Sequence, residues 1–415
     1  MAGNKAATEW RNFWFLPVAA ALGYSIGVLH TYSLGPFMQP LQEAFGWSRG
    51  QISLGITIAG VGTALFGVPV GMLIDRLGPR IVGLIGAITM SASVALLGTA
   101  TGDKANWALL WCVVALGSVC VHATVWTAAV ATRFEASRGL AFAVTLSGAS
   151  IGATAFPLLA TWLIGSFGWR TAFAALPAIW VAIVLPLLLI FFRGANDGTR
   201  QQRAAATLAV NTLPGVTFAE GLRSPAYYKL LLAGGFFAFT AIGITVHFVP
   251  ILTDAGAERM TAASIAGLIG IFSIVGRLGT GFLLDRFPGH VVGAGCFVLP
   301  IIAAALLLFD GANPMSQSAA AAIFGLTVGA EIDVIAYLAT RQFGLKSFGS
   351  LFGGIVTALA LGVAFGPLVA GQTFDRYGSY GSFLVLNMIL MAISSVALAT
   401  LGRGRFGARE PASQA

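Results

Sequence analysis

The stretch that decides the fold is GMLIDRLGPR, residues 71–80, which lies between two long apolar runs. A partial copy, GFLLDR at 281–286, lies 210 residues further on, again between two apolar runs. The same offset aligns special-backbone residues elsewhere: Pro40 with Pro250, Gly46 with Gly256, Gly60 with Gly270, Pro157 with Pro367, and Gly168 with Gly378. An offset that holds without gaps at such residues indicates a duplicated unit, so we expect two halves of the same design.

Composition excludes a water-soluble chain. Of 415 residues, 57 % are apolar and only 9 % are Asp, Glu, Lys or Arg, whereas a soluble protein has about 25 % charged residues. So few charges cannot cover a soluble surface, and most of the chain must face lipid or protein. Cys112, Cys120 and Cys296 all lie in apolar runs, and their spacing gives neither a disulfide framework nor a metal site. We expect no metal and no cofactor.

Twelve apolar runs are long enough to cross a bilayer core of about 30 Å, which needs about 20 residues per helix. They lie near 13–38, 52–74, 81–100, 107–131, 139–163, 171–192, 228–252, 262–284, 291–309, 317–340, 348–373 and 380–401. In lipid, backbone hydrogen bonds must close within each helix. The expected fold is therefore all-α, with twelve transmembrane helices in two pseudo-symmetric six-helix bundles, 1–192 and 227–415. A basic linker, 193–226, joins them and holds one short surface helix near 217–222.

The basic residues predict the topology. If the amino terminus is inside, seventeen of the 23 Lys and Arg fall in inner segments and five in outer loops. This bias follows the positive-inside rule and places both termini in the cytoplasm, in a multi-pass protein of the cytoplasmic membrane. Trp10 and Arg11 lead straight into a full-length span, so we expect no cleavable signal. The net charge of +8 is then a topology signal and not a nucleic-acid footprint.

The 71–80 segment and its copy resemble the signature loop of the major facilitator superfamily. The resemblance covers nearly the whole chain and implies a transporter that holds its substrate between two rocking halves. It also implies a charge lock on the inner face, opened and closed in each cycle, formed by Asp75, Arg76, Arg80, Asp285 and Arg286. A simple helix cap with arginines reaching toward lipid headgroups is the alternative.

Within the superfamily, three stretches resemble the monocarboxylate-porter branch and its relatives, the oxalate–formate exchangers. They are FGWS at 45–48, the segment from Gly152 and Pro157 to GWR at 168–170, and the segment from GP at 366–367 to GSY at 378–380. The resemblance implies a small carboxylate as the substrate and a monomer as the working unit.

Charged and titratable groups at bilayer depth are the candidate functional residues, because burying a charge there costs at least about 2.5–3.5 kcal/mol. Six qualify: His30, His122, His247, Arg277, Glu331 and Asp333. The superfamily lines its cavity with spans one, four, seven and ten. The three histidines and the two acids fall on those four spans, which favours positions that face water.

Arg277 is the expected anion-binding group. Its guanidinium is permanently charged and matches the planar fork of a carboxylate. Gly276 and Gly279 leave room beside it, and monocarboxylate porters carry a substrate-binding arginine in the same segment of span eight. The alternative is a buried ion pair with Glu331 or Asp333, and both can hold if the substrate displaces the acid.

The chain departs from the family at two positions. Animal members carry an acid where this sequence has Ser273 and a lysine where it has Tyr32. Those two family residues serve proton coupling and substrate binding, so their usual relay is in doubt here. Tyr32, His30 and Trp126 remain expected to contact the substrate, although aromatic residues on these spans more often serve packing.

Another proton relay is available. Histidine titrates near neutral pH, and Glu331 and Asp333 are about 200° apart on a helix, so they cannot share a face. Asp333 shares a stripe with Tyr337 and Arg341, which leaves Glu331 as the expected cavity acid. We expect Glu331, His122, His247 and Asp333 to be the candidates for proton coupling. For a membrane histidine the alternative is a hydrogen bond to a neighbouring helix.

These features predict a secondary transporter that moves a small carboxylate with a proton. A proton-independent carboxylate exchanger is the first alternative, and a carrier of neutral or drug-like solutes is the next. A membrane enzyme or receptor is the alternative of another class. No His-x-x-x-His pair or nucleotide-binding Gly-x-x-x-x-Gly-Lys string favours an enzyme or an ATP-driven pump.

Overall fold

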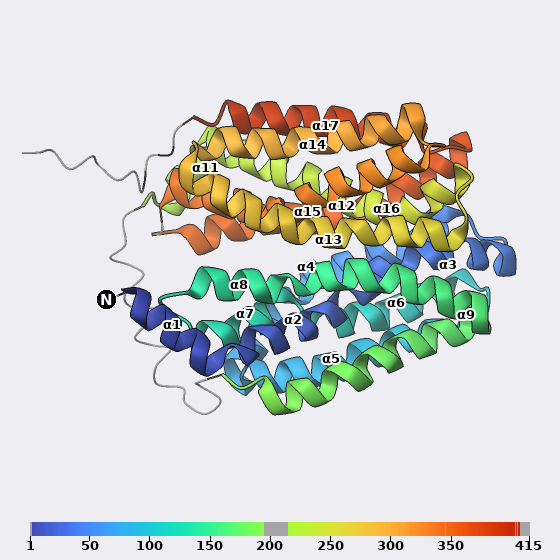
Figure 1. Ribbon diagram of the computed structural model, residues 1–415, viewed down its shortest axis with the longest axis horizontal. Helices are drawn as coiled ribbons and strands as arrows, with labels where there is room; N and C mark the ends of the chain where they lie inside the picture. The colour runs from blue at the N-terminus through green and yellow to red at the C-terminus, as the bar shows by residue number, and fades with distance from the viewer. Residues whose placement is uncertain (1, 195–214, 345, 403, 405, 407–415) are drawn as a thin grey trace, which may run out of the picture.

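The computed structural model describes residues 2–194, 215–344, 346–402, 404 and 406, and these are almost entirely helical. Figure 1 shows two bundles lying along one another, the N-terminal half in blue to green and the C-terminal half in yellow to red. The N-terminus and α11 (Phe218–Arg223) lie at one end, which we call the proximal end. The turn between α3 (Leu29–Phe45) and α4 (Arg49–Leu77) lies at the other, the distal end.

The remaining helices complete the two halves. The N-terminal half also contains α1 (Ala2–Phe13), α2 (Phe15–Gly27), α5 (Pro79–Leu96), the 3-10 turn η1 (Leu97–Thr99), α6 (Lys104–Val119), α7 (Ala123–Ala131), α8 (Arg138–Leu146) and α9 (Gly148–Phe191). The C-terminal half also contains α12 (Pro225–Asp254), α13 (Arg259–Arg286), α14 (Gly289–Asp310), α15 (Pro314–Phe343), α16 (Phe348–Tyr377) and α17 (Gly381–Ala399).

The twelve predicted spans are confirmed. Ten stretches of the described chain are long and apolar enough to cross a membrane. One of them, Arg138–Phe191, passes through Gly168, whose φ of 77° breaks the helix, so it holds two spans. The 29-residue α4 lies among them and supplies the twelfth.

Three spans of the N-terminal half are broken near their middles, which the apolar pattern did not predict. Span one breaks at Val28, span four at 120–122 and span five at Ser147. The first two breaks lie together, because a Cβ added to Gly27 would stand 2.7 Å from the carbonyl oxygen of Val121. Interrupted helices at membrane depth are tolerated where they line a cavity or are buried in protein.

The duplication is visible in the backbone. Gly46 and Gly256 both adopt positive φ, at 67° and 97°, and so do Gly168 and Gly378, at 77° and 68°. Both pairs are related by the 210-residue offset. Each glycine ends a helix at the distal end in a conformation that a residue with a Cβ rarely adopts.

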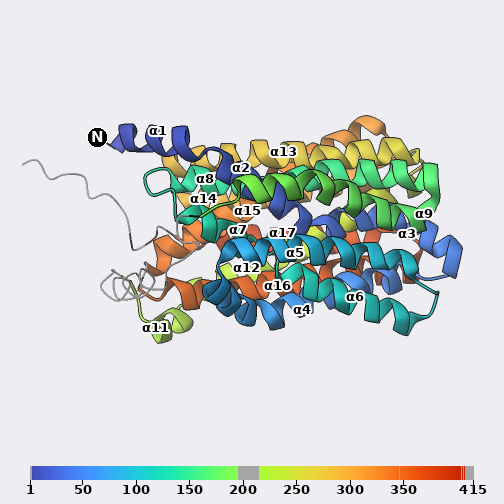
Figure 2. The same ribbon diagram turned by 90° about the horizontal axis from the view of Figure 1, so that it is seen from below.

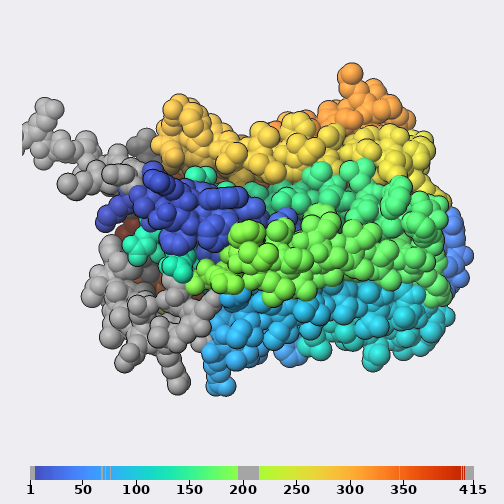
Figure 3. All heavy atoms as spheres, turned by 60° about the horizontal axis from the view of Figure 1, so that its bottom comes forward, coloured from blue at the N-terminus to red at the C-terminus, as the bar shows by residue number. Residues whose placement is uncertain are grey.

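The same offset relates two close contacts between the halves. A Cβ added to Gly60 of α4 would stand 2.9 Å from Ala364 Cβ of α16. A Cβ added to Gly270 of α13 would stand 2.2 Å from Thr154 Oγ1 of α9. Since 60 and 270, and 154 and 364, are each 210 apart, the halves meet along two repeat-related seams. Figure 3 shows α13 in yellow and α9 in green along one of them.

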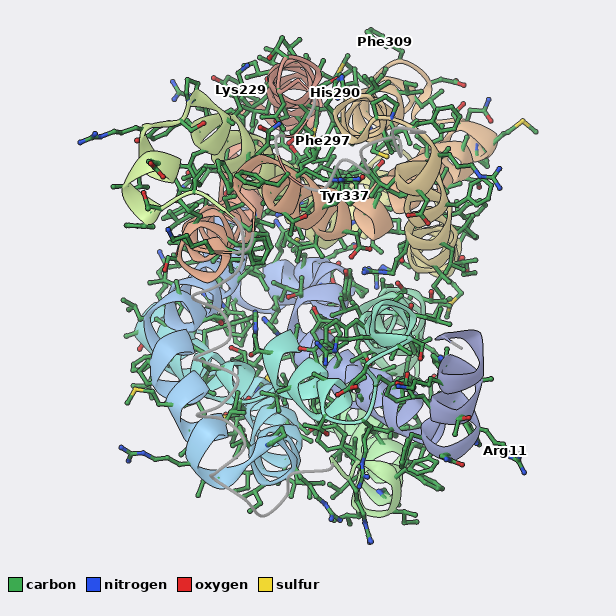
Figure 4. The ribbon with its side chains drawn as sticks, turned by 90° about the vertical axis from the view of Figure 1, so that its left-hand side faces the viewer. Arg11, Lys229, His290, Phe297, Phe309 and Tyr337 are labelled. Carbon is green, nitrogen blue, oxygen red and sulfur yellow. The ribbon has the colours of Figure 1, made fainter. Side chains whose placement is uncertain are left out.

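Each half also has its own core. Buried residues form two clusters, one largely within the N-terminal half around Trp111 and Trp126, and one within the C-terminal half around Phe237 and Phe297. Separate cores permit the halves to move as units, because their interiors do not depend on the contact between them. Viewed from the proximal end, the two halves stand one above the other (Figure 4).

Candidate functional site

The candidate site is built around Arg277 on α13. Its Nη1 donates a hydrogen bond of 3.1 Å to Oδ2 of Asp333 on α15. The two helices can approach because Gly276 and Gly329 face each other's backbones: an added Cβ would stand 1.9 Å from the carbonyl oxygen of Leu326 and 1.8 Å from that of Ser273, respectively. The Arg277 side chain is 11 % exposed and that of Asp333 is 36 % exposed, so the pair is partly open to the interior.

Two polar atoms beside the Arg277–Asp333 ion pair make no hydrogen bond with the described residues. Arg277 Nε and Glu331 Oε1 are both buried and have no hydrogen-bond partner among the described residues. A buried polar atom without a partner is costly. Within the described part of the chain, these two atoms therefore retain unused hydrogen-bonding capacity.

The N-terminal half faces these charges across the junction. Tyr24 on α2 and Tyr32 on α3 both lie close enough to Arg277 and Glu331 to interact electrostatically with them. The site therefore combines groups from both halves, near the middle of the chain's long helices. Tyr24 was not among the expected site residues; its position on a cavity-lining span was the available signal.

His122 and His30 occupy different surroundings. His122 stands at the break between α6 and α7, where its side chain is exposed although it lies halfway along a span. His30 packs edge-on against Trp111, with ring centroids 6.0 Å apart, and its buried Nδ1 has no hydrogen-bond partner in the described part of the chain. His122 is thus accessible at the break in span four, whereas His30 is directed into the N-terminal half.

Trp126 does not lie where substrate contact was expected. Its side chain is fully buried, and its indole Nε1 donates to the carbonyl oxygen of Val121 at 2.9 Å. It packs against Phe192, and its ring fills the space over Gly23. Trp126 therefore closes the core behind the broken span four and does not line the junction, because its ring is needed where the helix backbone is interrupted.

A second group of charges joins the halves at the distal end. We call the set Arg49, Ser53, His247, Asp254, Asp375 and Tyr380 the distal latch. Arg49 binds Asp254 with both Nη atoms, Nη2 at 2.9 Å from Oδ1, and Nη1 also donates to Tyr380 Oη at 2.8 Å. Its guanidinium stacks on Phe374, 3.8 Å from the ring centroid. The amides of Arg49 and Gly50 donate to Asp375 at 2.9 and 2.8 Å.

Sequence reasoning missed Arg49, which looked like one of five scattered outer-loop cations. The offset was an available signal, because Arg49 aligns with Arg259. Arg259 also bridges the halves, to Glu43 on α3 at 3.4 Å. The two bridges differ: the Arg49 side chain is 9 % exposed and that of Arg259 is 51 % exposed. Exposed ion pairs contribute little to stability, so the Arg49–Asp254 pair is the one that stabilises the contact between the halves at this end.

His247 belongs to this latch and is fully buried. Its Nε2 lies 2.9 Å from the carbonyl oxygen of Pro367 and 3.0 Å from Ser53 Oγ, and its Nδ1 lies 2.7 Å from Tyr380 Oη. It thus contacts both halves. The structure places it away from Arg277, with the residues that close the distal end.

At the proximal end, four glycines from the two halves have open space beside them. A Cβ added to Gly139, Gly279, Gly349 or Gly353 would meet nothing within 4 Å. Both ion pairs that described side chains form between the halves, those of Arg49 and Arg259, are distal. The described ion pairs therefore join the halves at the distal end.

The expected charge lock lies at the proximal end. Arg76, Asp285 and Arg286 are exposed, Arg286 stacks on Phe282 of its own helix, and Arg80 donates to Leu189 O within the N-terminal half. The side chain of Asp75 lies outside the described part. The hydrogen bond of Arg80 and the ring contact of Arg286 thus each stay within one half.

Two repeat-related bundles, joined at one end and with charged groups at their junction, define the class: a helical membrane transporter of the two-bundle type. The chain belongs to the Major Facilitator Superfamily, whose family model matches residues 20–367. The protein is therefore a membrane transporter and not an enzyme.

Its relatives agree with the branch that the motifs indicated. Monocarboxylate transporter 13 of Rattus norvegicus is 26 % identical over 384 residues, covering 89 % of this chain and 84 % of the relative. The uncharacterized MFS-type transporter YcxA of Bacillus subtilis is 23 % identical over 368 residues, covering 87 % and 88 %. Among solved structures, a D-xylose-proton symporter matches with a TM-score of 0.74 at 13 % identity, covering 94 % of this chain and 98 % of that one, which shows the shared fold.

Proposed function

We propose that this transporter moves a small carboxylate together with a proton, by alternating access, with Arg277 as the group that binds the carboxylate. The observation that carries the proposal is the pair of buried polar atoms without partners, Arg277 Nε and Glu331 Oε1, at the junction of the halves. A carboxylate oxygen satisfies the first and a proton satisfies the second. The named monocarboxylate transporters among the relatives support the same substrate class.

Charge balance provides the coupling. With Arg277 paired to Asp333, an ionised Glu331 leaves the site with one net negative charge, which opposes entry of an anion. A proton on Glu331 makes the site neutral, and the bound anion then brings its net charge back to one negative charge. Arg277 can exchange part of its contact from Asp333 to the substrate, because Asp333 is partly exposed and can be hydrated. We assign His122, exposed at the break of span four, as the group that passes the proton between Glu331 and water.

The cycle closes the halves alternately at their two ends. The distal latch holds one end in the arrangement described here. When the substrate is released, we propose that Arg76, Arg80, Asp285 and Arg286, with Asp75, form the proximal lock as the latch opens. The excess of basic residues at the proximal end supports a cytoplasmic location for that end and for both termini.

Uptake by purified protein in liposomes tests the function. Wild-type protein should take up a radiolabelled small carboxylate, such as lactate or pyruvate, saturably and faster when the outside is acid. Arg277→Ala should abolish uptake, and Arg277→Lys should retain a small part, because lysine keeps the charge without the fork. Full uptake by Arg277→Ala would overturn the assignment.

A proton-independent exchanger is the second candidate. It is favoured by Ser273 and Tyr32, which stand where the family carries its acid and lysine; here Ser273 donates to Ser150 at 2.6 Å and serves the seam between the halves. Exchange of labelled for unlabelled carboxylate that ignores an imposed pH gradient would support this candidate over symport.

A further inference from the structure

The hydrogen bonds of the distal latch have a fixed direction. Pro367 offers only a carbonyl oxygen, so the bond to His247 requires a hydrogen on Nε2. In a neutral imidazole, Nδ1 is then an acceptor and must receive the hydrogen of Tyr380. Tyr380 in turn accepts from Arg49 Nη1. The chain therefore runs from Arg49 through Tyr380 and His247 to Pro367, with each group donating to the next.

This chain joins the two halves only while the imidazole is neutral. A proton on Nδ1 would place two hydrogens between Nδ1 and Tyr380 Oη, so the hydroxyl would lose its acceptor. It would also put a second positive charge beside Arg49. Among the described residues, the imidazole faces Arg49 from α4 and Tyr380 at the start of α17, and Tyr380 in turn lies near Asp375 from α16 and Asp254 at the end of the helix that carries His247.

The two carboxylates cannot readily compensate. Asp254 is held by both Nη atoms of Arg49, and Asp375 accepts from the amides that begin α4. Turning Tyr380 toward Asp254 would compete with Arg49 for that carboxylate. A protonated His247 therefore weakens the contacts that hold Arg49. Arg49 forms the buried ion pair between the halves at this end, with Asp254.

We propose that His247 is a proton-binding site that controls the distal latch. The latch stays closed while the imidazole is neutral and opens when Nδ1 binds a proton. Tyr380 is the positioning residue. The proposal deepens the proposed function and rests on alternating access, since it makes opening toward the distal side depend on proton uptake there. It is separate from the carboxylate site, because no latch residue contacts Arg277 among the described side chains.

The asymmetry of the repeat supports this assignment. The offset aligns His247 with Phe37, which stacks on Phe173 at 3.7 Å between ring centroids. The related bridge of Arg259 and Glu43 has no histidine and is exposed. The titratable ring thus occurs on the side whose ion pair is buried and carries the closure.

A distance measurement without substrate tests the proposal. Spin labels on Lys104→Cys and Met315→Cys, exposed distal residues of opposite halves, report latch opening after Cys112, Cys120 and Cys296 are replaced by serine. The protein is reconstituted in lipid nanodiscs and compared at about pH 8 and about pH 5.5, on either side of the ordinary histidine pKa. We expect the open-to-closed ratio to rise by about tenfold, because one linked proton gives a tenfold change per pH unit and only the unit between about pH 6.5 and about pH 5.5 lies below the ordinary histidine pKa.

Two variants isolate the histidine. His247→Gln, whose amide can accept from Tyr380 and donate to Pro367, should remain closed at both pH values. Tyr380→Phe should open the latch partly at both and remove most of the pH response, which keeps the test decisive if the glutamine variant fails to fold. His290→Gln, on α14 at the proximal end, should behave like the wild type.

A wild-type pH response in either latch variant would overturn the proposal. The measurement contains no anion, so its outcome does not depend on the substrate. Conversely, loss of carboxylate uptake in Arg277→Ala with an intact latch response would leave this inference standing and test only the proposed function.

Discussion

Arg277 and Asp333 form an ion pair between neighbouring helices of one half, with Nη1 and Oδ2 3.1 Å apart, and the adjacent guanidinium Nε has no hydrogen-bond partner among the residues that the structure describes. The ion pair therefore uses only part of the hydrogen-bonding capacity of the guanidinium. Asp333 holds the guanidinium at Nη1, and under the proposed function Nε is the group that a carboxylate would reach.

This relationship predicts the effect of Asp333→Asn. The amide keeps the hydrogen bond to Nη1 but removes the charge that competes with an anionic substrate. We expect the apparent KM for carboxylate to fall by up to about tenfold, equivalent to about 1.4 kcal/mol of relieved competition. Concentration-dependent uptake in liposomes measures it. A rise in KM would mean that Asp333 assists the substrate instead.

Glu331→Gln separates proton coupling from anion binding. The neutral amide mimics the protonated acid, so carboxylate should still bind and exchange across the membrane. Uptake driven by a pH gradient should fall by about 100-fold or more, the range that a positioned proton-transfer group contributes. Asp333→Asn, which leaves Glu331 in place, is the matched control. Gradient-driven uptake unchanged in Glu331→Gln would show that the proton travels elsewhere.

The seam between α13 and α9 predicts a contrast between two glycines of one helix. Gly270→Ala adds a methyl that would stand 2.2 Å from Thr154 Oγ1 and should cost about 1–3 kcal/mol, the usual range for overpacking. Gly279→Ala meets nothing within 4 Å and should be neutral or slightly stabilising. Thermal unfolding in detergent compares them; equal melting temperatures would contradict the seam.

The helix before span one predicts an acid-sensitive contact at the proximal end. Figure 2 shows α1 projecting beyond the helices of its bundle. Glu9 on α1 accepts from the amides of Glu135, Ala136 and Ser137 and from the Ser137 hydroxyl. These bonds, the Ala136 amide and Ser137 hydroxyl above all, lower the pKa of Glu9 from 4.5 to about 2.

The sign of this pH dependence follows from the lowered pKa of Glu9. The stability that ionised Glu9 gives to this contact is fully present above about pH 4.5 and is lost as the pH falls toward 2. Glu9→Gln should therefore raise hydrogen exchange at residues 135–137 at neutral pH and remove the acid dependence of that exchange. Glu220→Gln, whose carboxylate caps only its own helix at Thr217, is the control. Unchanged exchange in Glu9→Gln would contradict the contact.

The sequence placed some candidate residues near one another, and their roles stay predictions. Arg277, Glu331 and Tyr32 were expected at the junction from their depth in the membrane and from the family resemblance, and they lie near one another. Trp126 was expected there too, but its ring fills the core, since position on a span does not specify which way a side chain points. The broken spans were missed because a helix interrupted for one to three residues keeps an unbroken apolar pattern.

The sequence by itself determined the number of spans, the duplication and the identity of the charged groups at bilayer depth. Each follows from a local rule: span length from bilayer thickness, and special backbone positions from glycine and proline. Only the tertiary structure decided which groups meet. Arg49 and Asp254 are 205 residues apart, and a loop arginine becomes a buried bridge only because two seams bring the distal ends of the halves together. Such partners depend on the packing of whole helices, which no local pattern encodes.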